Sequence, residues 1–314
     1  MEIVSPFCSM PQWRVSKGRK EGRIPTAFAA AKHVVEGIEC REVEIDIDVV
    51  GTIRILEATA SSQDTLVEMA LALDEDELPL AGNILQSGDP YGFVLWPAAS
   101  AAATHLLTKC GSSDTKKPLE GLTILELGSG TGLVSIAASL GGASRILATD
   151  IESAPLTLLA YASKNLNQCE TQIESSEPRT VFAQGFFVFL LLIFASTHVG
   201  LLDLKDFSTP LPPADIVVAA DIMYEPSTGR AMARRVAEAL RRGSRVVVGD
   251  SPGRAGRPAF LEELGNLGVK HAAFVDTIGR TCSGPRHELI CGKGSTSVTD
   301  SPEALSVAIM DLQG

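Results

Sequence analysis

Apolar and polar residues alternate along residues 41–58, as they do in β-strands with one buried face. The alternation breaks at Gly51, so we expect an N-terminal β-hairpin that turns at this glycine. A helical pattern over residues 64–74 follows. A loop rich in glycine and proline then leads through Trp96-Pro97 into an alanine-rich helix that ends near residue 107.

A regular alternation of strands and helices begins at residue 122. We expect strands over residues 122–127, 145–150, 215–220 and 244–249, and helices over residues 133–140, 156–167, 228–242 and 259–267. Strands that alternate with helices indicate a parallel sheet covered on both faces. Two further segments, residues 271–276 and 287–291, have the pattern of an antiparallel pair at the edge of this sheet. The pattern predicts an α/β fold, a Rossmann-like doubly wound seven-stranded sheet with an antiparallel edge strand, extended by the N-terminal hairpin.

The chain divides into three parts on this interpretation. Residues 1–40 are expected to be a flexible basic leader, residues 41–292 the α/β domain, and residues 293–314 a disordered tail. The leader has basic residues but also Glu2 and Glu21, which are unusual in an organellar transit peptide. We therefore expect a cytoplasmic protein, with organellar import as the alternative.

Residues 185–200 do not fit the alternation, because residues 186–195 are ten consecutive apolar residues. This run is too short to span a bilayer, which takes about 20 residues. It is either a buried strand or helix, or retained intron sequence, since T-rich codons encode Phe, Val, Leu and Ile. Without it, residues 181–184 would join residues 201–203 into one short strand that runs into a loop.

Composition excludes several classes of protein. The net charge of -11 argues against a sequence-independent grip on nucleic acid, which requires a positive surface. None of the six cysteines forms a C-x-x-C pair, and the five histidines have no metal-ligand spacing, so we expect no metal. We also expect no membrane association and a monomer.

A glycine-rich loop lies between the expected strand 122–127 and the helix that follows. Gly128, Gly130 and Gly132 allow a sharp turn and the close approach of a ligand that a Cβ would exclude. Asp150 ends the next strand, where a carboxylate can accept hydrogen bonds from both ribose hydroxyls of a nucleoside. A dinucleotide fingerprint would need a glycine at the position of Leu133.

Glu126 distinguishes further between the ligands of such a loop. Directly ahead of the glycines, a carboxylate is unsuited to a pyrophosphate but suits a cationic amino-acid tail. We therefore expect S-adenosylmethionine as the cofactor.

The tetrapeptide that begins at Asp221 and ends at Tyr224 follows the expected strand 215–220. Ligands of doubly wound sheets bind at the carboxyl ends of the strands, so these two side chains should border the reactive methyl group. An Asp–Tyr pair suits an aliphatic amine better than a planar amide. The alternative is that Asp221 caps a helix and Tyr224 packs against the core. Trp96 is equally open, because its indole could cover the ligand or belong to the core.

Together these residues resemble the methyltransferase-like protein-lysine methyltransferases of family 16, which modify non-histone proteins. The resemblance covers residues 40–292 and rests on Val94-Leu95-Trp96-Pro97-Ala98-Ala99, the glycine loop, Asp150 and residues 219–224. It implies that Asp221 and Tyr224 face the lysine. Contacts with S-adenosylmethionine are expected from Trp96, Glu126, Gly128, Ser129, Gly130, Gly132, Asp150 and Ala220.

Two further segments bear on this resemblance. Residues 249–254 are similar to a G-D-P-G-R run of the flavoprotein-β lysine methyltransferases, with one residue inserted. Family members often have a tryptophan after the third strand, and Leu204 stands there in this chain, which affects the adenine edge of the pocket.

We therefore expect a protein-lysine N-methyltransferase whose partner is a protein that presents a lysine. The alternatives are a small-molecule N-methyltransferase and a catalytically inactive, methyltransferase-like binding protein.

Overall fold

The structure is a computed structural model of the chain and describes residues 32–72, 89–111, 117–169, 171–173, 196–270, 272–281 and 303–314. Its helices are α1 (Ala60–Ala72), α2 (Pro97–His105), α3 (Leu133–Leu140), α4 (Ser153–Tyr161), α5 (Pro226–Arg241) and α6 (Gly256–Asn266). Shorter helical turns cover Tyr91–Phe93, Leu106–Cys110 and Ala162–Leu166. The predicted alternation of strands and helices is confirmed.

The main sheet has eight strands in the order β10-β11-β9-β8-β4-β5-β7-β6. They are β4 (Thr123–Leu127), β5 (Arg145–Asp150), β6 (Thr171–Ile173), β7 (Ser196–Leu201), β8 (Ile216–Ala220), β9 (Arg245–Asp250), β10 (Val275–Thr281) and β11 (Glu303–Leu312). All the pairings from β9 to β6 are parallel, whereas β11 is antiparallel to both of its neighbours. The three-residue strand β6 is one strand more than predicted, and the antiparallel strand lies one position in from the edge.

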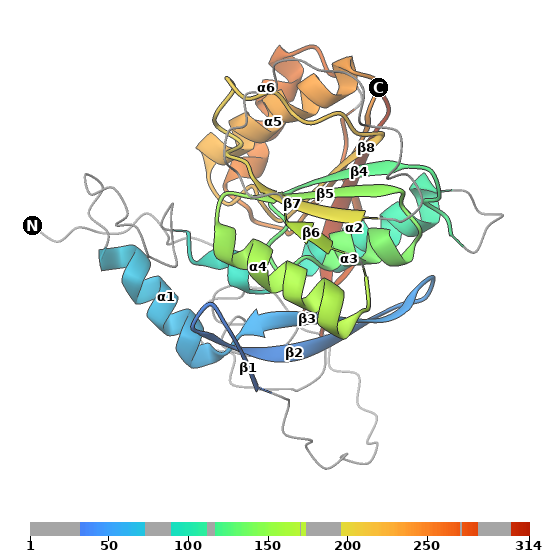
Figure 1. Ribbon diagram of the computed structural model, residues 1–314. Coiled ribbons are helices and arrows are strands. Elements are labelled where there is room, and N and C mark those ends of the chain that lie inside the picture. The colour runs from blue at the N-terminus through green and yellow to red at the C-terminus, as the bar shows by residue number, and fades with distance from the viewer. Residues whose placement is uncertain are drawn as a thin grey trace, which may run out of the picture.

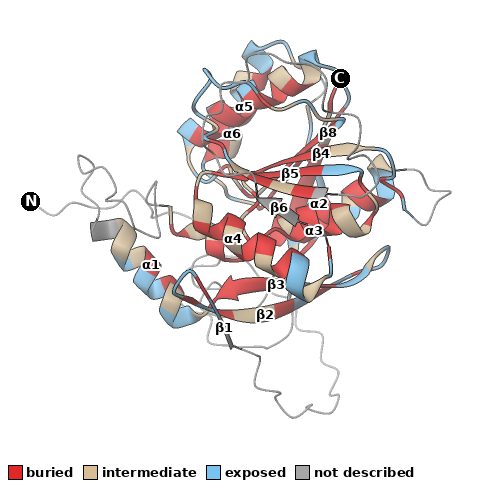
Figure 2. Cartoon of the chain, viewed as in Figure 1, coloured by how far each residue is buried: buried red, intermediate tan, exposed pale blue. Residues whose placement is uncertain are grey.

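Helices cover both faces of this sheet, as Figure 1 shows: α2, α3 and α4 on one side and α5 and α6 on the other. Alternate residues of a strand therefore face two different cores, and Figure 2 colours both of them red, as buried. In β8, Val218 belongs to the core under α2 and α3, and Val217 to the core under α5 and α6. In β9, Val247 and Val246 divide in the same way. Burial on both faces explains why these strands are continuous apolar runs.

A three-stranded antiparallel sheet of β1 (Lys32–Val35), β2 (Ile38–Ile47) and β3 (Gly51–Ala58) lies beneath α3 and α4 (Figure 1). The predicted hairpin is β2 and β3, which turn at Gly51 with φ of 83°. Strand β1 corrects the predicted boundary of the leader, because residues 32–40 belong to the sheet. Glu36 and Gly37 have φ of 55° and 81°, which suits a two-residue hairpin turn. Residues 1–31 of the leader lie outside the described residues.

The predicted disordered tail is wrong over residues 303–312, which form β11. This strand pairs with β10 on one side and β9 on the other, and Val307, Ala308, Ile309 and Met310 are all buried. Its pattern is continuous rather than alternating, because helices cover both sides. The first strand of the expected pair 271–276 and 287–291 is also corrected, because it pairs with β11. The first strand begins later, at Val275, and residues 287–291 lie outside the described residues.

The apolar segment 185–200 overlaps the sheet. Residues 185–195 lie outside the described residues, but Ser196–Leu201 form β7 between β5 and β6. Thr197 and Val199 are buried there. Removal of residues 185–200 would thus delete five of the six residues of β7, and the strand expected from joining 181–184 to 201–203 does not match this arrangement.

None of the helices in the described part of the chain combines the length and apolar character that a membrane span requires.

Candidate active site

A cavity of about 430 Å³ opens at the carboxyl ends of β4, β5, β7 and β8. This is the edge at which doubly wound sheets bind their ligands, and the volume lies within the range of small-molecule sites. Seven of the ten residues predicted for the site line it: Trp96, Gly128, Gly130, Asp150, Ala220, Asp221 and Tyr224. The sheet thus brings together residues from loops that lie far apart in the sequence.

The glycine loop leaves β4 with left-handed backbone angles. Gly128 has φ of 68° and Gly130 has φ of 48°, a region that side chains with a Cβ rarely adopt. A Cβ on Gly128 would lie 2.6 Å from Cγ2 of Ile222, and one on Gly130 would lie 3.1 Å from the carbonyl oxygen of Gly92. Both glycines are therefore required by the backbone and by their close neighbours, and both present backbone to the cavity.

Asp150 ends β5 and is buried at the floor of the cavity. Its Oδ2 accepts the Gly130 amide at 2.8 Å, and its Oδ1 accepts the Glu152 amide at 3.2 Å. Burial raises the pKa of this carboxyl to about 6, although hydrogen bonds from the Gly130, Glu152 and Ile151 amides act in the opposite direction. A carboxylate has about four acceptor positions, so Asp150 can accept further hydrogen bonds.

Three residues predicted as cofactor contacts do not line the cavity. Glu126 is buried beside α3, where it accepts a short hydrogen bond from the Ser135 hydroxyl, and burial raises its pKa to about 8. Ser129 is buried, and a Cβ on Gly132 would meet Leu159 at 2.3 Å. Glu126 is the fourth of the five β4 residues, so the pleat directs it to a helix rather than into the loop. The assignment of Glu126, Ser129 and Gly132 as cofactor contacts stays a prediction, and this geometry does not support it.

Asp221 follows β8 with φ of 57° and its carboxylate is fully buried. Oδ2 accepts the Ala98 amide at 2.8 Å and the Ser251 hydroxyl at 3.0 Å. Oδ1 accepts the Ser251 amide at 2.7 Å and the Arg254 guanidinium at 3.3 Å. The carboxylate thus joins the start of α2 to the loops after β8 and β9, with all four acceptor positions occupied. Its predicted contact with the lysine stays a prediction, and this geometry favours a structural role.

Tyr224 lines the cavity, and 41% of the residue is exposed. Its hydroxyl donates to Oδ2 of Asp89 at 3.1 Å, and the Tyr91 amide donates to Oδ1 of Asp89 at 2.9 Å. Burial raises the pKa of Asp89, and the neighbouring acids Glu152 and Glu225 raise it further. Tyr224 and Asp89 therefore form a polar pair from two loops that are 135 residues apart.

Trp96 also lines the cavity, and Arg254 lies over its indole with the guanidinium carbon 4.4 Å from the ring centroid. The indole Nε1 donates to the Tyr91 carbonyl at 3.0 Å. Such a cation–π contact fixes both side chains in place. The Trp96 side chain thus forms part of the cavity wall and does not belong only to the hydrophobic core.

Sequence reasoning missed fourteen residues that also line the cavity, among them Asp89, Glu152 and Ile222. They carry no spacing signal, because loops after different strands contribute them. Residues 202–204 follow β7 and line the cavity too, so Leu204 lies at the edge where the resemblance led us to expect a tryptophan.

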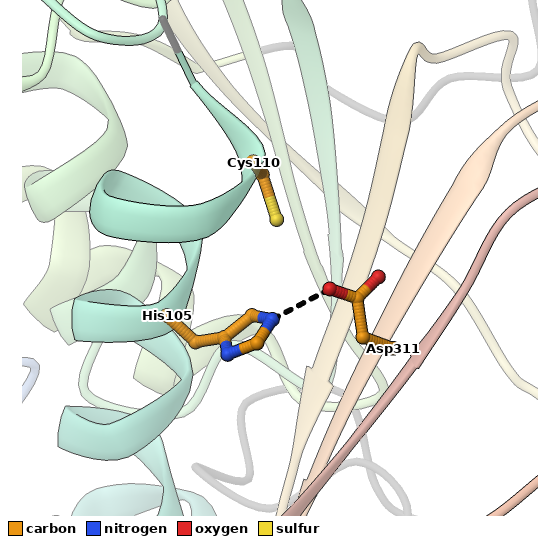
Figure 3. Close-up of side chains that lie close together, drawn as sticks. All are labelled: His105, Cys110 and Asp311. Carbon is orange, nitrogen blue, oxygen red and sulfur yellow. Dashed lines mark hydrogen bonds and ion pairs between the residues drawn. The ribbon is translucent and has the colours of Figure 1, made fainter. Parts of the chain in front are cut away.

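One cluster outside the cavity could hold a metal by its donor atoms alone. In the described part of the chain, donor atoms of His105, Cys110 and Asp311 lie within 4.8 Å of one another. Figure 3 shows these three side chains together. However, Arg245 donates to both oxygens of Asp311, at 2.8 Å and 2.6 Å, and His105 lies 2.6 Å from Oδ2. Burial raises the pKa of the Cys110 thiol to about 12. Arg245 thus supplies the positive charge, and the cluster anchors β11 to β9 and α2.

Residues 73–177 match a family model described as lysine methyltransferase. The electron transfer flavoprotein beta subunit lysine methyltransferase of Xenopus laevis is 30% identical over 169 residues, which are 54% of this chain and 54% of that protein. The human protein of the same name is 44% identical over 64 residues, 20% of this chain and 22% of that protein. Among solved structures, a magnesium protoporphyrin IX methyltransferase from Synechocystis is 15% identical with a TM-score of 0.37, covering 68% of this chain and 76% of that one.

The matched segments span between 22% and 54% of the length of the two lysine methyltransferases. The family match includes both the glycine loop and Asp150, which meet at the floor of the cavity. In its segment 73–177, this chain is therefore similar to the lysine methyltransferase family.

Proposed function

We propose that this protein is an S-adenosylmethionine-dependent methyltransferase that modifies a lysine of a non-histone protein. The observation that carries the proposal is the position of Asp150 beside the left-handed glycines at the floor of the cavity. The names of the relatives, both of which are protein-lysine methyltransferases, support a protein substrate.

The residues of the cavity fit this cofactor. The cradle formed by Gly128 and Gly130 has no room for a Cβ, so a ligand can approach the backbone closely. Asp150 keeps acceptor capacity for a ribose hydroxyl beside its amide donors. Five acidic and two basic side chains line the cavity, which suits a cationic ligand. When bound, S-adenosylmethionine supplies a methyl group on a positively charged sulfur.

The protein's own residues then have three tasks. Asp150 and the glycine loop hold the nucleoside, and alignment of the reacting atoms provides most of the rate enhancement in such a transfer. The acidic lining attracts the lysine, whose ammonium has a pKa of about 10.4 in water and must lose a proton before it reacts. The wall made by Trp96 and Arg254 limits access of water from that side.

Two measurements test this function. Calorimetry should show that the protein binds S-adenosylmethionine, and that Asp150→Ala weakens binding at least about tenfold, because each lost charge-assisted hydrogen bond is worth about 1.5–3 kcal/mol. Tritiated cofactor should then label a protein, with electron-transfer flavoprotein β subunit as the first substrate to try. Label that appears only in small molecules would refute the protein substrate, and absence of binding would refute the activity.

The proposal also includes a protein partner, a cytoplasmic location and a monomeric state. Cell fractionation and light scattering of the purified chain test the last two.

A further inference from the structure

Several carboxylates line the cavity, and Asp89 is one whose acceptor positions are only partly used. Asp221 has four donors, and Asp150 lies beside the nucleoside cradle. Asp203 accepts the Lys205 amide at 2.8 Å. Asp89 is the carboxylate that Tyr224 holds in place: the Tyr91 amide donates to its Oδ1 and the Tyr224 hydroxyl to its Oδ2. A carboxylate accepts about four hydrogen bonds, so Asp89 retains capacity toward the cavity that it lines.

The charged groups that act directly on Asp89 are acids. They are Glu152, which accepts the Asp89 amide at 3.3 Å, Asp150, and Glu225, which Lys205 already pairs at 2.7 Å. Among the described residues, no basic side chain forms an ion pair with Asp89. A desolvated carboxylate among other acids is costly unless a cation compensates it. The arrangement thus favours a positively charged ligand group at this place.

Tyr224 determines where that group would lie. Its hydroxyl donates to Oδ2 of Asp89, which fixes the carboxylate beside the loop that leads into α5. The partly exposed ring of Tyr224 adds an aromatic face, which also attracts cations. Carboxylate and ring together match an alkylammonium group, with donors for the carboxylate and a methylene stem for the ring.

We propose that Asp89, positioned by Tyr224, is the receptor of the cavity for a primary alkylammonium. Two sources have this chemistry: the lysine side chain of the substrate, and the amino-acid end of the cofactor. The inference rests on the proposed function, because both sources belong to it, but it assigns the task to Asp89 in place of Asp221.

Calorimetry with three nucleosides tests the inference without turnover. The first probe is S-adenosylhomocysteine, the second is methylthioadenosine, which lacks the amino-acid end, and the third is an S-adenosylhomocysteine analogue with nitrogen in place of sulfur and an aminoethyl arm that imitates the lysine. We expect Asp89→Asn to reduce affinity about tenfold or more for at least one of the two amine-bearing probes, the loss of one charge-assisted hydrogen bond, with methylthioadenosine unchanged. Tyr224→Phe should have a smaller effect on the same probe, since the ring remains.

The probes separate the two sources and the two failures. Loss confined to the aminoethyl analogue supports the lysine, and equal loss for the analogue and S-adenosylhomocysteine supports the amino-acid end. If Asp89→Asn binds all three probes like the wild type, or loses methylthioadenosine as well, the receptor role is wrong while the proposed function stands. If the wild type binds no probe, the proposed function itself fails. Glu262→Gln, an exposed acid in α6, is the matched control and should change nothing.

Discussion

Replacement of Asp221 by asparagine should destabilise the protein before it affects chemistry. The carboxylate accepts from the Ala98 amide, from the amide and hydroxyl of Ser251, and from Arg254. Asparagine retains one acceptor oxygen and turns an NH₂ group toward the donors on the other side. Backbone strain does not contribute to the expected loss of stability, because asparagine tolerates a φ of 57° as well as aspartate does.

The magnitude follows from the lost partners. Two hydrogen bonds disappear, and at least one buried backbone amide is left facing a donor, at about 1–3 kcal/mol for each unsatisfied group. We expect a loss of about 2–4 kcal/mol in the free energy of unfolding. For a chain of this length the melting temperature falls by about 2–4 °C for each kcal/mol, so Asp221→Asn should melt about 5–15 °C lower.

Denaturant unfolding and a thermal melt of the purified variant measure this, with Asp64→Asn as the control, since Asp64 is exposed in α1. A variant that melts within about 1 °C of the wild type would refute the structural role of Asp221. If that variant also lost methyl transfer, the catalytic role predicted from the sequence would be favoured instead.

Three further predictions concern the cofactor and the sheet. The pKa of Asp150 is raised to about 6, and only the ionised carboxylate offers all its acceptors. Affinity for S-adenosylmethionine should therefore rise as pH increases through about 6 and level off above it. Calorimetry from about pH 5 to pH 8 should show this rise in the wild type and a flat profile in Asp150→Asn. Gly128→Ala should weaken cofactor binding at least about tenfold, because the new Cβ would lie 2.6 Å from Ile222, whereas Gly121→Ala, with φ of 82° and nothing within 4 Å, should alter stability but not binding. Equal effects of the two alanines on binding would contradict the steric argument. Truncation before Glu303 removes β11 and exposes the inner edges of β9 and β10, so cooperative thermal unfolding should disappear, and a native-like melt would show that β11 is dispensable.

Local patterns in the sequence determined most of the fold and the part of the site that would hold the cofactor. Continuous apolar runs predict strands that are buried on both faces, and helical periodicity predicts the helices between them. Glycines with left-handed angles and a carboxylate at the next strand end, Gly128, Gly130 and Asp150, identify the cofactor cradle because their chemistry is local. The same reasoning failed for β11, whose residues show no alternation and whose partners are distant strands.

Only the tertiary structure decided what the remaining polar groups do. Asp221 and Asp89 are both carboxylates at the edge of one cavity, and no spacing rule distinguishes them. The difference arises from partners far along the chain: Ala98 and Ser251 occupy Asp221, whereas Tyr224 only orients Asp89. A hydrogen bond depends on the positions of two atoms in space, and those positions are set when all the loops at the sheet edge pack together. The sequence therefore names the candidates, and the packing assigns their tasks.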